Sequence, residues 1–103
     1  MSNNRYKILV VEDDDNIRGL IGTILETNGY QTIPTHTCQM GKTLFSSHNP
    51  DLVLLDLGLP DADGMEFISF VRKTSTMPII VLSAKQNIQR LYLEVHYNYP
   101  YRM

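Results

Sequence analysis

The stretch that most constrains the fold is a run of four apolar residues, 52–55, which ends in Asp56. A turn rich in glycine, proline and aspartate follows at residues 57–64. A short, continuous apolar run bounded by turn residues is typical of a strand buried on both faces of a parallel sheet. Open α/β sheets bind their ligands at the carboxyl ends of such strands. The pattern therefore predicts a central parallel strand that places Asp56 at the functional edge of the sheet.

Further apolar runs at residues 7–11 and 78–82 predict two more inner strands. The β-branched stretch 31–34 is also strand-like, but Pro34 restricts it to a sheet edge or a strand end. The segments between the strands show helical periodicity, over residues 17–25, 38–48 and 64–74. Strands and helices thus alternate, with connections short enough to require right-handed crossovers. This order predicts an α/β fold, a parallel sheet with helices on both faces.

The composition narrows the class of protein. A chain of 103 residues predicts one domain, over residues 1–103. A net charge of −2 leaves no basic surface for nucleic acid or for an anionic membrane. The only cysteine, Cys38, excludes an internal disulfide and is expected to pack as a small apolar residue. The polar start lacks the apolar core of a signal peptide, and no apolar run is long enough to span a bilayer. We therefore expect a cytoplasmic protein that binds neither a membrane nor nucleic acid directly.

Polar side chains follow three of the predicted strands. Glu12 and Asp13 begin an acidic run after the first strand, Asp56 follows the third, and Ser83 follows the fourth. Because the carboxyl ends of parallel strands meet at one edge, the three acids are expected to converge. Carboxylates held this close repel one another unless protons or a cation neutralise them. Oxygen ligands of this kind suit Mg²⁺, or Mn²⁺ in its place.

A metal ion held there would also neutralise the charge on a phosphoryl group during its transfer, which is most of the catalytic task in phosphoryl-transfer sites. Asp56 is the natural nucleophile for an acyl phosphate, and the Ser83 hydroxyl can donate a hydrogen bond to it. Each residue taken alone has a simpler interpretation: the acidic run as a solvated helix start, Asp56 as a turn former, Ser83 as a helix cap. Their coincidence at adjacent strand ends favours the site.

Several segments resemble the receiver (CheY-like) domain of bacterial two-component response regulators. The matching segments are residues 8–14 with Arg18, 51–60, 63–64 and 78–84, which together extend from residue 7 to about residue 85. Residues 55–61, 66–68 and 81–84, with Gly64, look most like the Kdp-type regulators of potassium-transport genes, in the OmpR family. The resemblance implies a flavodoxin-like, doubly wound sheet of order 2-1-3-4-(5). The fifth strand and the last helix are expected to be missing or atypical.

The resemblance also implies residue roles. Asp56 matches the aspartate that accepts a phosphoryl group from a sensor histidine kinase, and Ser83 matches the hydroxyl that senses it. Asp13 matches a direct Mg²⁺ ligand, Glu12 a ligand acting through water, and the backbone carbonyl of Gly58 the main-chain ligand. Such a domain assists its own phosphorylation and dephosphorylation but is not an enzyme acting on other molecules. Joined to a DNA-binding domain, it would control transcription.

The chain departs from this family after about residue 86. The family's Lys-Pro pair is absent, and the last lysine, Lys85, is only two residues beyond Ser83 and is expected to face solvent. A short helix is predicted at about 87–92, with the remainder left open between helical and strand-like alternation. A truncated or frame-shifted coding sequence would explain the departure; alternatively, residues 95–99 replace the fifth strand.

The same segment leaves the partner and the function open. The alternating Tyr97 and Tyr99 are compatible with a strand that folds back, or with an edge that pairs with another chain in a homodimer. A non-switching pseudo-receiver, acting as a protein-interaction module, is the alternative function because the lysine is missing. A Mg²⁺-dependent phosphatase of related fold needs a second aspartate where Gly58 stands, and is rejected.

Overall fold

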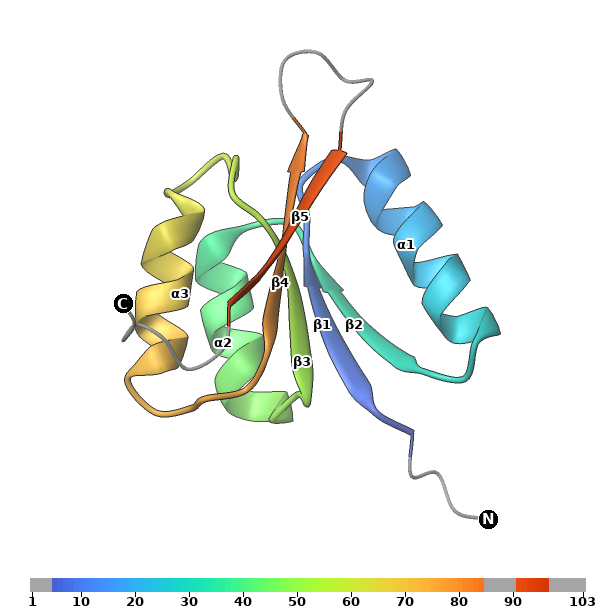
Figure 1. Cartoon of the computed structure of the whole chain (residues 1–103), viewed down its shortest axis with the longest axis horizontal. Coiled ribbons are helices and arrows are strands. Elements are labelled where there is room, and N and C mark those ends of the chain that lie inside the picture. The colour runs from blue at the N-terminus through green and yellow to red at the C-terminus, as the bar shows by residue number, and fades with distance from the viewer. Residues whose placement is uncertain (1–4, 85–90, 97–103) are drawn as a thin grey trace.

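The computed structural model describes residues 5–84 and 91–96, of which residues 83–84 and 91–96 are described by their backbone alone (Figure 1). Strands and helices alternate in chain order up to the fourth strand, and a fifth strand follows directly. The elements are β1 (Lys7–Val11), α1 (Asp15–Thr27), β2 (Gln31–Thr35), α2 (Cys38–His48), β3 (Leu52–Asp56), α3 (Gly64–Arg72), β4 (Ile79–Ala84) and β5 (Leu91–His96). The strands and helices predicted for residues 7–82 are all present.

The strands form one five-stranded sheet in the order β2-β1-β3-β4-β5. The first four strands run parallel, and the register places Val11 beside Leu55 and Asp56 beside Leu82. The predicted doubly wound order 2-1-3-4 is confirmed. The proline-containing strand β2 lies at the sheet edge, as predicted.

The fifth strand corrects two predictions. β5 runs antiparallel to β4, with Leu91 beside Ala84 and His96 beside Ile79, so the sheet is not parallel throughout. Only residues 85–90 separate the two strands, whereas a parallel crossover needs roughly a dozen residues or more. The helix predicted at about 87–92 is wrong at residues 91–92, which begin β5; its first residues lie outside the described range. The substitute strand expected at 95–99 begins earlier, and residues 97–99 also lie outside that range.

The two faces of the sheet are covered differently. Helices α2 and α3 lie side by side on one face, and α1 lies on the other (Figure 1). Under α2 and α3, alternate residues of the inner strands pack against Phe67, the largest fully buried side chain. Gly41 of α2 packs closely there: a Cβ would lie 3.1 Å from Phe67 Cε1 and 3.3 Å from Val11 Cγ2, so both side chains would have to move by a few tenths of an ångström to make room for it. The Cys38 side chain is buried in this core, as predicted.

The α1 side is less well covered within the described part of the chain. No residue of α1 is fully buried, and Leu20 and Ile24 are 61% and 52% exposed. Leu54 and Ile80, on the inner strands β3 and β4, are only half-buried. Among the described residues no helix has the length and apolar character needed to cross a membrane.

Candidate functional site

The carboxyl ends of β1 and β3 bring three acids together. Glu12 and Asp13 directly follow β1, and Asp56 is the last residue of β3. One carboxylate oxygen from each lies within 4.8 Å of the others. The predicted convergence of these residues, distant in sequence, is therefore found. It follows from the parallel pairing of β1 with β3, which sets Val11 beside Leu55.

Glu12 is held in place by the backbone around it. Its side chain is buried, and Oε2 accepts a hydrogen bond from the Asp14 backbone N–H at 3.1 Å. Its own N–H donates to the carbonyl of Thr35, at the end of β2, at 3.0 Å. Its carbonyl accepts from Nη1 of Arg18 at 2.8 Å. Strand β2 and helix α1 thus both fix the position of Glu12.

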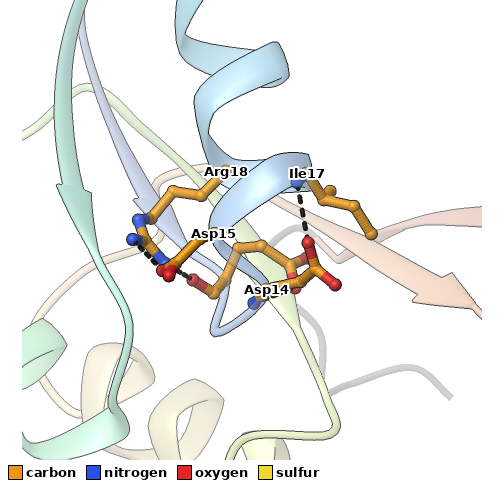
Figure 2. Close-up of polar contacts among 5 residues, drawn as sticks. Asp14, Asp15, Ile17 and Arg18 are labelled. Atoms are coloured by element: carbon orange, nitrogen blue, oxygen red, sulfur yellow. Dashed lines mark hydrogen bonds and ion pairs between the residues drawn. The ribbon is translucent and has the colours of Figure 1, made fainter.

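The remaining acids of the run serve the start of α1 (Figure 2). Asp14 is the N-cap, and its Oδ1 accepts a hydrogen bond from the backbone N–H of Ile17 at 2.9 Å. Asp15 pairs with Nη2 of Arg18 at 2.6 Å. The acidic run therefore divides: its second half caps the helix, as the simpler interpretation predicted, and only its first half faces Asp56.

The pKa values of Glu12 and Asp56 are both raised, chiefly because the two carboxyl groups are partly withdrawn from water. Burial, with the nearby charge of Asp56, raises the pKa of Glu12 to about 7. Burial is also the main cause of a raised pKa at Asp56, with Asp13 contributing. Within residues 5–82, whose side chains are described, the ion pairs Arg18–Asp15 and Lys42–Glu66 involve other acids, and neither pairs a cation with the cluster. Clustered, oxygen-only donors with unbalanced negative charge fit a hard divalent cation such as Mg²⁺.

The loop after Asp56 folds back on itself. The Gly58 N–H donates to Oδ1 of Asp56 at 3.2 Å, and the Gly64 N–H donates to the Leu57 carbonyl at 3.1 Å. Gly64 is required by this close approach, because a Cβ would lie 2.7 Å from the Cα of Leu57. The backbone of Gly58 is therefore held directly beside the Asp56 carboxylate.

Ser83 is placed by its backbone. It lies inside β4 and not after it, one residue beyond Leu82, the register partner of Asp56. On its other side, Ser83 is the register partner of Tyr92 in β5. Its backbone thus lies at the edge of the sheet that carries the acids, and its role as a phosphoryl sensor stays a prediction.

Two residues near the site were not identified from the sequence. The Thr35 carbonyl holds Glu12, and Arg18, known only as part of a matching segment, joins the Glu12 carbonyl to Asp15. A carbonyl carries no residue-specific signal, so Thr35 could be found only from the pairing of β1 with β2. The spacing of Arg18 from Asp15, three residues along a helix, does predict an ion pair.

The fold agrees with the comparison to known families. The model of the response regulator receiver domain matches residues 8–95, and the chain belongs to this family of signalling modules. Among curated proteins, the KDP operon transcriptional regulatory protein KdpE of Escherichia coli K12 is 46% identical over 78 residues, which are 76% of this chain and 35% of that protein. KdpE of Staphylococcus aureus is 39% identical over 85 residues, or 82% of this chain and 37% of that protein.

Solved structures support the same family. The BeF₃-activated receiver domain of Klebsiella pneumoniae RstA aligns with a TM-score of 0.74 and 30% identity, over 81% of this chain and 71% of that one. The receiver domain of the Francisella response regulator 1452 gives 0.73 and 30%, over 82% and 71%. The chain spans about a third of the length of the curated relatives it matches. It is a receiver domain of a two-component response regulator, homologous to KdpE and other OmpR-family transcriptional regulators.

Proposed function

We propose that Asp56 is the phosphoacceptor of this receiver domain. The observation that carries the proposal is the cluster of Glu12, Asp13 and Asp56, whose oxygens lie within 4.8 Å at the ends of β1 and β3. Asp13, Asp56 and the Gly58 carbonyl would hold Mg²⁺ (or Mn²⁺) directly, with Glu12 acting through water. The donor would be a phosphohistidine of a sensor kinase, or a small acyl phosphate.

In the proposed reaction a carboxylate oxygen of Asp56 attacks phosphorus. A P–O bond forms as the P–N bond to the kinase histidine breaks, and the imidazole leaves with a proton from solvent. Bound Mg²⁺ would supply the positive charge that offsets the phosphoryl oxygens. The Gly58 N–H orients the nucleophile through its hydrogen bond to Oδ1 of Asp56. Glu12 must lose its proton before the site can take a cation, which a pKa of about 7 allows at neutral pH.

The output is proposed from the relatives. The curated relatives are named as transcriptional regulators, and KdpE of E. coli as the regulator of the KDP operon. Joined to a DNA-binding domain, the receiver would control transcription in the cytoplasm, with potassium-transport genes as the candidate target. Strand β5 is an edge of the sheet, and an edge strand supports association between copies of the chain.

The test is phosphorylation by a small acyl phosphate with Mg²⁺, read by intact mass. The wild-type chain should gain one phosphoryl group, and Asp56→Asn should gain none. Asp51→Asn is the matched control, because Asp51 lies just before the opposite end of the same strand, where it accepts a hydrogen bond from the Lys7 N–H. Equal labelling of the wild type and of Asp56→Asn would refute the assignment, and so would an unlabelled wild type.

A non-switching pseudo-receiver is the second candidate. It is favoured by the antiparallel β5, together with the missing Lys-Pro pair. In this case the chain would accept the phosphoryl group without responding to it. Amide exchange and oligomeric state that are the same before and after phosphorylation would support the pseudo-receiver; a change in either would exclude it.

A further inference from the structure

A carboxylate from the loop after Asp56 reaches the start of α2. Oδ1 of Asp61 accepts the N–H of Cys38 at 2.8 Å, and its Oδ2 accepts the N–H of Gln39 at 3.0 Å. The next two N–H groups of the helix are served by Thr37: its hydroxyl accepts from Met40, and its carbonyl accepts from Gly41. The Gly41 bond is the first regular bond of the helix, so three of the amides that a helix start leaves unpaired, those of residues 38–40, are satisfied by side chains, two of them by a side chain from another part of the chain.

We propose that Asp61 is a positioning residue of the phosphoacceptor site, which sets the place of the Gly58 backbone by fixing the loop to α2. The inference rests on the proposed function of Asp56. The carboxylate of Asp61 forms its hydrogen bonds with the backbone of α2 and not with any of the three clustered acids. Asp61 would therefore affect the site only through the backbone of the loop.

The loop is short and anchored, so a movement at Asp61 is passed to Gly58. Between them lie Leu59, whose side chain is buried in the core, and Pro60, whose φ is fixed by its ring. The other end of the loop is held by the hydrogen bond from Gly64 to Leu57. Asp61 thus links this loop to the first turn of α2 through two hydrogen bonds.

The hydrogen bonds of Asp61 also connect the loop after Asp56 with the part of the chain that positions Glu12. Helix α2 follows directly after β2, whose last residue, Thr35, accepts the N–H of Glu12. Asp61 therefore joins the Asp56 loop to the element that positions Glu12. The two amides also lower the pKa of Asp61, so its carboxylate is charged wherever the protein is folded at neutral pH.

The test compares Asp61→Ala with Glu66→Gln by amide exchange. Glu66 is the matched control, because its carboxylate also contacts α2, through Lys42 at 2.7 Å, but lies in α3 outside the loop. Asp61→Ala should speed exchange at Cys38 and Gln39 and, beyond them, at Gly58 and Gly64. Glu66→Gln should leave Gly58 and Gly64 unchanged. Asp61→Asn keeps one acceptor oxygen, so its amide exchange rates should lie between those of Asp61→Ala and of the wild type. It also replaces Asp61→Ala if the alanine variant does not fold.

Metal affinity is the second measurement, with Mn²⁺ followed by electron paramagnetic resonance. Loss of a group that orients a metal ligand typically weakens binding by roughly 10–100-fold, so Asp61→Ala should weaken Mn²⁺ binding about ten-fold. Faster exchange confined to Cys38 and Gln39, with unchanged Mn²⁺ affinity, would reduce Asp61 to a helix cap and overturn the inference. A wild type that binds no Mn²⁺ and takes no phosphoryl group would instead overturn the proposed function, while exchange at Gly58 still decides the positioning role.

Discussion

Replacing Glu12 with glutamine should stabilise the metal-free protein, and do so only at neutral and alkaline pH. Burial raises the pKa of Glu12 from 4.5 to about 7 in the folded protein. The folded state therefore keeps this proton up to a higher pH than the unfolded state does. Stability from this group is fully present below pH 4.5 and is lost as the pH rises through 7. Glutamine has nearly the same shape and never carries the charge.

The size of the effect follows from the pKa shift. The pKa of Glu12 in the folded protein, about 7, is well above its ordinary value of 4.5. At ~1.4 kcal/mol per pKa unit, an ionised Glu12 costs up to about 3–4 kcal/mol of folding free energy. Part of this cost belongs to Asp56, whose pKa is also raised by burial. Glu12→Gln should therefore gain about 1–3 kcal/mol over the wild type above pH 7, and little at pH 5.

Urea unfolding with a chelator present, at pH 5 and at pH 8, measures the difference directly. Asp15→Asn is the control, because the Asp15 side chain is 86% exposed and its pair with Arg18 is worth little. Saturating Mg²⁺ should remove the advantage of Glu12→Gln at pH 8, since the cation stabilises only the ionised cluster. A gain of equal size at both pH values, or none at pH 8, would refute the explanation by burial.

Three further substitutions test the packing. Gly64→Ala puts a Cβ 2.7 Å from the Cα of Leu57; urea unfolding should show a loss of about 1–3 kcal/mol, and an unchanged midpoint would contradict the close approach. Phe67→Ala empties a fully buried site and should cost about 3–5 kcal/mol in the same assay. Leu20→Lys, at a residue that is 61% exposed, should change thermal stability by no more than about 0.5 kcal/mol. A much larger loss at Leu20 would mean that the α1 face is covered in solution.

The fold was predictable where local pattern and topology agree. Residues 52–55 have the pattern of a buried strand because both faces of β3 are at least partly covered. Helix α2 begins at the predicted residue because Thr37 caps it. Helix α3 ends at Arg72, before the predicted residue 74. The N–H groups of the next two residues donate to the carbonyls three residues back, on Phe70 and Val71, in the pattern of a 3₁₀ turn. The acidic cluster was predictable because parallel strands end at one edge, whatever the intervening sequence is.

The contacts that complete the site were not predictable in this way. Asp61 lies more than 20 residues along the sequence from Cys38 and Gln39, whose N–H groups donate hydrogen bonds to its carboxylate. Its sequence neighbourhood indicates only a turn, because aspartate beside proline is common in turns. The antiparallel β5 was ambiguous for a different reason, since helical and alternating patterns overlap in the segment that contains it. Its direction follows from the length of the connection, which is a constraint on the whole sheet and not a residue preference.

The direction of β5 also bears on how the site can respond. In a parallel arrangement, the carboxyl end of the fifth strand would lie beside Asp56, and a residue following that strand could contact the phosphoryl group. Here the amino end of β5 lies there instead, with Leu91 beside Ala84, while His96 lies at the opposite edge beside Ile79. The carboxyl end of β5 therefore lies at the edge of the sheet opposite the acids. Among the residues whose side chains the structure describes, the groups that place Glu12, Asp13 and Asp56 belong to β1, α1, β2, α2, β3 and the loop before α3. If Asp56 accepts a phosphoryl group as proposed, substitutions on either side of β4 should therefore separate acceptance from its readout.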